Sequence, residues 1–67
     1  MNRLWRVRRR GQWIDATLEP RANGWRLTFS RVGRELAALD FDSEDRAREA
    51  AGDRLRELER AGWTEHW

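Results

Sequence analysis

The chain has 67 residues, of which 39% are hydrophobic and 39% are charged, and it contains no cysteine. A chain of this length buries only about 60% of the surface that its unfolded form exposes, so residues 1–67 are predicted to form a single small domain. The lack of cysteine excludes a disulfide framework and a thiolate metal site. No segment approaches the roughly 20 apolar residues that span a bilayer, and the start of the chain lacks the apolar run of a signal peptide. We therefore expect a cytoplasmic protein.

All 14 basic residues are arginines, and they are unevenly distributed. Residues 1–34 carry nine arginines and two acids, a net charge of +7, whereas residues 35–67 carry five arginines and ten acids, a net charge of −5. Such a split is typical of a chain with one strongly charged interaction surface. The planar guanidinium fork of arginine suits phosphate and guanine, although a GC-rich genome also favours arginine codons.

Alternating side chains predict two strands at the beginning of the chain. The first covers Leu4–Arg10, Gly11 marks a turn, and the second covers Gln12–Glu19. Pro20 is expected to end the second strand because proline cannot donate to the hydrogen-bond ladder. The side chains predicted to face the core are Trp5, Val7, Ile14, Ala16 and Leu18. Those predicted to face the open side are Arg6, Arg8, Arg10, Trp13, Asp15, Thr17 and Glu19.

Two further strands are predicted after a second turn. Asn23-Gly24 is typical of a tight hairpin turn, and Trp25–Ser30 then alternates, with Arg26 on the open side. Val32-Gly33 predicts another turn. The fourth strand, Arg34–Phe41, contains apolar residues that do not keep one parity, which indicates a bulge.

A helix is predicted to follow the strands. Ser43 is suited to cap its first turn, and Glu44 and Asp45 place negative charge at its positive end. Gly62 is expected to end the helix and Trp63 to fold back onto its last turn. One apolar stripe faces the sheet and consists of Ala47, Ala50, Ala51, Leu55, Leu58 and Ala61. The fold class is therefore α+β: a three- to four-stranded antiparallel meander followed by one C-terminal amphipathic helix packed on one sheet face.

The sequence contains few residues that could support catalysis. The only histidine is His66, and no cysteine or nucleophile motif accompanies it, while a catalytic cleft with its supporting residues needs more chain than this. The acidic residues Asp40, Asp42, Glu44 and Asp45 could hold a divalent cation, but they coincide with the helix start, where capping explains them better. We predict neither an enzyme nor a cofactor.

The open face of the first three strands is the predicted functional surface. Arginines beside an exposed aromatic ring are common where proteins bind nucleic acid, because guanidinium groups neutralise phosphates and the ring packs on sugar or base. A sheet can enter the major groove without a recognition helix, which favours duplex DNA over RNA. Arginines on the open face can also have a purely structural role: they prevent edge-to-edge pairing of sheets or form ion pairs with neighbouring acids. The predicted binding residues are Arg6, Arg8, Arg10, Trp13 and Arg26.

A resemblance to a known family rests on Val7-Arg8-Arg9-Arg10, Gly11-Gln12-Trp13, Glu19-Pro20, Asn23-Gly24 and Phe41-Asp42-Ser43-Glu44-Asp45. By these motifs the chain resembles the AP2-type DNA-binding domain, including its variant at the N-terminus of phage integrases. The resemblance implies a three-stranded sheet with a helix, and strand arginines matching Arg8 and Arg10 that contact bases and phosphates in the major groove. The chain departs from the family in its additional strand, Trp25–Ser30, and in Trp5, where the family usually has arginine.

Two other classes remain open. The segment Gly24-Trp25-Arg26-Leu27-Thr28-Phe29 is similar to the signature strand of small antitoxin subunits of the HicB type, which implies a protein partner or a homodimer. A phage or mobile-element protein that binds a host enzyme is the third class. Exposed tryptophans such as Trp13 or Trp67 would suit a protein partner as well as a base.

Overall fold

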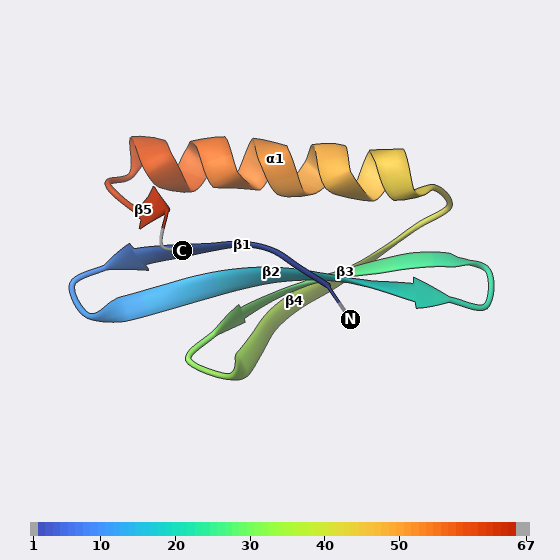
Figure 1. Ribbon diagram of the computed structural model, residues 1–67, viewed down its shortest axis with the longest axis horizontal. Helices are drawn as coiled ribbons and strands as arrows, with labels where there is room; N and C mark the ends of the chain where they lie inside the picture. The colour runs from blue at the N-terminus through green and yellow to red at the C-terminus, as the bar shows by residue number, and fades with distance from the viewer. Residues whose placement is uncertain (1, 66–67) are drawn as a thin grey trace.

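The structure, a computed structural model, describes residues 2–65 as one antiparallel sheet and one helix. The elements in chain order are β1 (Asn2–Arg9), β2 (Gln12–Arg21), β3 (Gly24–Arg31), β4 (Arg34–Phe41), α1 (Glu44–Arg60) and β5 (Thr64–Glu65). The sheet order is β4-β3-β2-β1-β5, and α1 lies across one sheet face (Figure 1). The predicted α+β meander with its C-terminal helix is confirmed, and β5 adds a short fifth strand beside β1.

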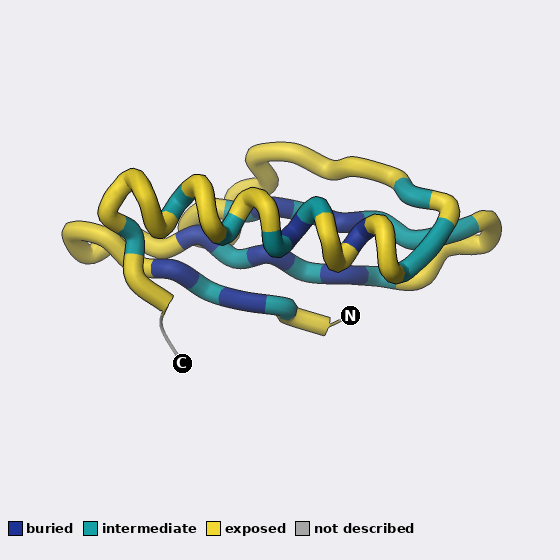
Figure 2. Tube along the Cα trace, turned by 90° about the horizontal axis from the view of Figure 1, so that it is seen from above, coloured by how far each residue is buried: buried dark blue, intermediate teal, exposed yellow. Residues whose placement is uncertain are grey.

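The core lies between α1 and the strands beneath it (Figure 2). Its centre is Trp5, which is 4% exposed, packs against Phe29 with ring centres 5.9 Å apart, and donates its indole N–H to the carbonyl oxygen of Ala51 at 3.0 Å. This bond ties β1 to α1. The buried strand residues confirm the side-chain alternation predicted for the first three strands: Trp5, Val7, Ile14, Ala16, Leu18, Leu27 and Phe29. Ala47 and Ala51 of α1 complete the buried set.

Both ends of α1 are capped as the sequence predicts. The Ser43 hydroxyl oxygen accepts a hydrogen bond from the backbone N–H of Arg46 at 3.1 Å. At the other end Gly62 has φ +98°, a conformation that glycine adopts without steric cost. The chain therefore reverses, and the backbone N–H of Trp63 donates to the carbonyl oxygen of Leu58 at 3.0 Å. This helix is neither long enough nor apolar enough to cross a membrane.

The predicted bounds of the first three strands are wrong by one or two residues, and for Pro20 and Arg10 this changes the place of the residue in the fold. Pro20 does not end the second strand but lies within β2, opposite Trp25. It is tolerated because the pairing of β1 with β2 reaches only as far as Leu18, so β2 has an unpaired edge at Pro20 and needs no donor there. Arg10 is not part of the first strand; it lies in the turn after β1, with φ +52°.

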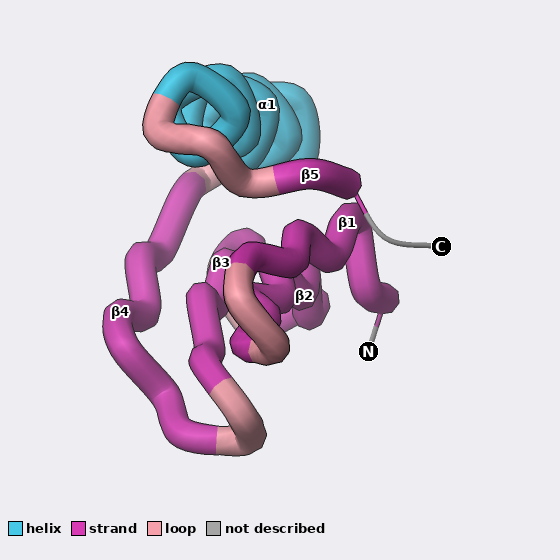
Figure 3. Tube along the Cα trace, turned by 90° about the vertical axis from the view of Figure 1, so that its left-hand side faces the viewer, coloured by secondary structure: helices cyan, strands magenta, loops and turns pink. Residues whose placement is uncertain are grey.

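The bulge predicted in the fourth strand is confirmed. The partner of Phe29 is Ala37 and the partner of Ser30 is Glu35, so Leu36 is an extra residue in β4. Figure 3 shows β4 curving away from α1. Because the helix does not cover this strand, Leu36 and Leu39 remain 53% and 45% exposed.

Candidate nucleic-acid interface

Arg6 and Asp15 face each other across β1 and β2 on the open face of the sheet. The Nε and Nη2 atoms of Arg6 donate to the two carboxylate oxygens of Asp15 at 2.6 and 3.0 Å. This hydrogen bonding raises the pKa of the Arg6 guanidinium above its ordinary value. The guanidinium also lies 5.7 Å from the ring centre of Trp13, which is 37% exposed. The positive charge of Arg6 is therefore already neutralised by a carboxylate on the neighbouring strand.

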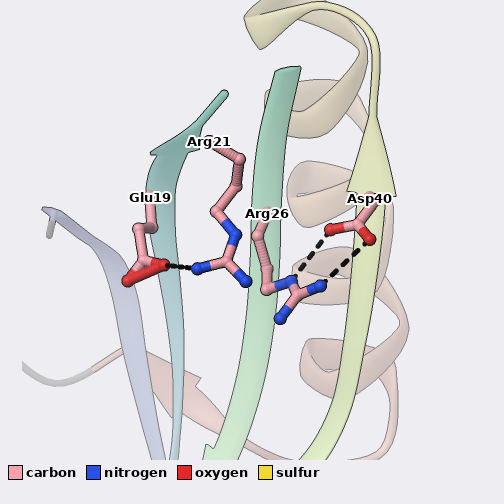
Figure 4. A network of polar contacts seen from close by, with 4 residues as sticks. All are labelled: Glu19, Arg21, Arg26 and Asp40. Carbon is pink, nitrogen blue, oxygen red and sulfur yellow. Dashed lines mark hydrogen bonds and ion pairs between the residues drawn. The ribbon is translucent and has the colours of Figure 1, made fainter. Parts of the chain in front are cut away.

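Arg26 is held in the same way at the other end of the sheet. Its Nε and Nη2 atoms donate to the carboxylate oxygens of Asp40 on β4 at 2.9 and 3.1 Å, and these bonds lower the pKa of Asp40. On the neighbouring strand, Arg21 donates to Glu19 at 2.8 Å (Figure 4). The structure thus places Arg26 in a surface network of ion pairs close to the turn between β2 and β3.

The other predicted residues gather near the turn between β1 and β2. Arg8 lies opposite Trp13 in the strand register, beside Arg6, and Arg10 is in the turn itself. Of the five predicted binding residues, the structure therefore brings four together and leaves Arg26 apart.

A denser group of arginines lies at this end of the molecule. An antiparallel meander brings alternate turns to the same end of a sheet, so the β1–β2 turn and the β3–β4 turn both lie at the end of the molecule where α1 stops (Figure 1). At this end the β3–β4 turn lies on the side away from α1 (Figure 3). We call this group the arginine end; its members are Arg8, Arg9, Arg10, Arg31 and Arg34. Within residues 2–65, no carboxylate forms an ion pair with any of the five.

Three adjoining surface hollows connect these arginines. The first, about 470 Å³, is lined by Arg8, Arg9 and Arg10 with Gly11, Gly62, Thr64 and Glu65. The second, about 260 Å³, shares Arg9 and Arg10 with the first and adds Gln12, Arg31 and Trp63. The third, about 510 Å³, shares Gln12 and Arg31 with the second and adds Val32, Arg34 and Leu36. The shared lining makes the arginine end one continuous surface.

Arg9 connects this surface to the helix. A Cβ atom on Gly62 would lie 3.5 Å from the Nε of Arg9, so the guanidinium packs directly against the turn that ends α1. The C-terminal end of a helix carries partial negative charge and favours a cation. Arg9 is therefore placed beside the negative end of the helix, at a turn whose φ of +98° favours glycine.

The two turns of the arginine end have the same backbone form. Arg10 and Gly11 have φ +52° and +76°, and Val32 and Gly33 have φ +51° and +76°. Positive φ at both central residues defines the type I′ hairpin turn, which favours Asn-Gly because other residues are strained there. Both turns therefore carry a strained side chain at the tip, an arginine in one case and a valine in the other.

Sequence reasoning missed Arg9, Arg31 and Arg34 as members of this surface. By the alternation of β1 the side chain of Arg9 points to the core side of the sheet. Arg9 is the last residue of β1, however, and lies past the end of α1. Arg31 and Arg34 flank the Val32-Gly33 turn that the sequence does predict. These residues could have been predicted from the order of the turns, because the first and third turns of a meander lie at the same end of the sheet.

No family model, no curated protein and no solved structure matches this chain. The AP2 resemblance therefore stays a prediction. In the part of the chain that the structure describes, no three His, Cys, Asp or Glu side chains come together as a metal site. His66 and Trp67 lie outside the described residues, so the roles considered for them also stay predictions.

Proposed function

We propose that the protein binds nucleic acid, preferentially duplex DNA, through the arginine end. The observation that carries the proposal is the continuous surface of five arginines without a carboxylate partner among residues 2–65. When a phosphate binds an unpaired guanidinium, the counterions held by the nucleic acid are released, which favours binding. No ion pair within the protein has to be broken first. Arg6 and Arg26 would first have to give up Asp15 and Asp40, so the proposal moves the main contacts from the open face to its end.

The shape of this end supports a duplex ligand. The hairpins end in two-residue turns, and the major groove of B-DNA, about 12 Å wide, admits a two-stranded ribbon. Arg8 and Arg10 would contact phosphates or guanine edges, as the AP2 resemblance also implies for them. Trp13, which lies opposite Arg8 on the open face, would pack along the sugar-phosphate backbone, and Arg6 would stay paired with Asp15 beside it.

The distribution of charge favours one direction of approach. The acidic residues around the start of α1 lie at the end of the molecule away from the arginine end (Figure 1), and the longest dimension is 37 Å. Three of the acids near the start of α1 are ion-paired, Asp40 with Arg26, Asp42 with Arg46 and Glu44 with Arg48, so this end carries little excess charge. A polyanion is therefore attracted mainly to the arginine end before contact. The acidic residues in question are Asp40, Asp42, Glu44 and Asp45.

The test is a titration of the intrinsic tryptophan fluorescence with random-sequence duplex DNA over a series of salt concentrations. The proposal predicts that the logarithm of the binding constant falls linearly with the logarithm of salt, by about 0.9 for each phosphate neutralised. Duplex RNA of the same length is the comparison, and weaker binding is expected. Absence of binding at low salt, or binding that does not respond to salt, would overturn the proposal.

A second candidate function is protein binding along β4. This strand is the outer edge of the sheet, and a groove of about 340 Å³ between it and α1 is lined by Phe29, Ala37, Leu39 and Ala50 together with charged residues of the helix. Exposed apolar edges of this kind serve partner proteins or a second copy. Sedimentation over a range of concentrations tests the second copy: an association that Leu39→Gln removes would support it, and a monomer throughout would contradict it.

A further inference from the structure

Val32 is an unusual residue for the tip of a hairpin. It has φ +51°, a conformation in which a β-branched side chain is strained, and it is 66% exposed. Asparagine or glycine would form the same turn without this strain. Val32 therefore lowers the stability of the turn and gains no burial in return, so stability does not explain an apolar side chain at this tip. Strain kept in this way is characteristic of functional positions.

The surroundings of Val32 have the composition of a site for a nucleobase. It lines the third hollow together with Leu36, and the rest of the lining is Gln12, Arg31 and Arg34. Val32 and Leu36 supply an exposed apolar shelf for the flat face of a base. The amide of Gln12 can donate to and accept from a base edge. The guanidinium groups of Arg31 and Arg34, in the same lining, can bind phosphates.

We infer that this hollow receives an unstacked base of the bound nucleic acid, with Val32 acting as the wedge that holds it out of the stack. The inference rests on the proposed nucleic-acid binding and specifies its preferred ligand: a duplex that already contains an unpaired or weakly stacked base. In an intact duplex the same contact requires unstacking, which costs free energy. The protein should therefore prefer a bulged duplex to a perfect one.

The two equivalent turns provide a matched pair of variants. Val32→Asn relieves the strain in the β3–β4 turn, removes the apolar wedge and leaves the charge unchanged. Arg10→Asn relieves the same strain in the β1–β2 turn, removes one charge and leaves the wedge in place. Both variants should unfold at urea concentrations equal to or above that of the wild type, so a loss of binding cannot be ascribed to misfolding.

The experiment measures the affinity of the three proteins for a perfect duplex and for the same duplex with one unpaired 2-aminopurine, whose fluorescence rises on unstacking. The wild type should bind the bulged duplex about tenfold more tightly and raise the 2-aminopurine signal. Val32→Asn should lose this preference, because its affinity for the bulged duplex should fall more than its affinity for the perfect duplex. Arg10→Asn should weaken binding to both duplexes equally and keep the preference.

Each outcome separates the inference from the proposed function. Salt-sensitive binding without a preference for the bulge, or a preference that survives in Val32→Asn, would overturn the inference and leave the proposed function intact. Failure of the wild type to bind either duplex at low salt would overturn both.

Discussion

Arg6 and Asp15 occupy opposite positions on β1 and β2 and join through two hydrogen bonds, so a predicted DNA-binding arginine is already engaged by a carboxylate. The exposed fractions of the two side chains are 29% and 19%. Arg8, the next residue on the same face of β1, has Trp13 opposite it instead of an acid. The residue directly opposite on the neighbouring strand therefore decides whether a strand arginine can bind a phosphate.

Replacing Asp15 by asparagine should release Arg6 for phosphate binding. Asp15→Asn is expected to strengthen binding to duplex DNA and to steepen the salt dependence by about 0.9, the contribution of one additional phosphate contact. The control is Glu49→Gln, which removes one negative charge from α1, on the opposite side of the sheet from Asp15. Equal effects of the two variants would show that only net charge matters and that Arg6 lies outside the bound surface.

The ion pair of Arg26 and Asp40 should make the free energy of unfolding depend on pH in the acid range. The pKa of Asp40 is below its ordinary value of 3.8 because Arg26 donates hydrogen bonds to the ionised carboxylate. The folded state therefore binds the proton less readily than the unfolded state, so this contribution is present above the ordinary pKa and is lost as pH falls through the lowered one. Asp40→Asn should lose less stability than the wild type between about pH 5 and about pH 2.

The measurement for Asp40 is the urea midpoint, followed by circular dichroism at several pH values in this interval. Glu49→Gln again serves as the control that removes one negative charge elsewhere on the surface. Parallel acid curves for Asp40→Asn and the wild type would show that the pair contributes nothing to the folded state.

Two glycines should respond to alanine in opposite directions. A Cβ atom on Gly24 would lie 2.2 Å from the carbonyl oxygen of Phe41, at φ +152°, so Gly24→Ala should destabilise the fold by more than about 2 kcal/mol. On Gly52, within α1, the nearest atom would be Nη1 of Arg56 at 3.6 Å, and alanine should stabilise by about 0.5–1 kcal/mol. Thermal unfolding measures both; a tolerant Gly24 would contradict the close approach of β3 and β4.

Side-chain alternation predicted the four long strands of the sheet and the two faces of the first three. It assigned Trp5 to the core and Trp13 to the open side, and the structure confirms both. It could not reveal β5, because two exposed residues, Thr64 and Glu65, show no periodicity. Pro20 was misassigned for a related reason: whether proline fits a strand depends on where the neighbouring strand ends.

The ion pairs that alter the candidate site depend on register. Arg6 meets Asp15 because the turn between β1 and β2 has two residues, so this pair could have been predicted from the turn length. Arg26 meets Asp40 only because Leu36 is an extra residue in β4; without this bulge its partner would be Leu39. Parity indicates that a bulge exists but not where it lies, so the second pair required the structure.

The most direct test of the arginine end compares two double variants that remove the same amount of charge. Arg10→Gln with Arg31→Gln removes two of its arginines, whereas Arg6→Gln with Arg26→Gln removes two ion-paired arginines of the open face. The measurement is the salt dependence of duplex DNA binding, with circular dichroism to confirm that both variants fold. Our account predicts that the first variant lowers the slope by about 1.8, two phosphate contacts, and that the second lowers it by less than half as much. A larger loss for the second variant would contradict the account and return the binding site to the open face of the sheet.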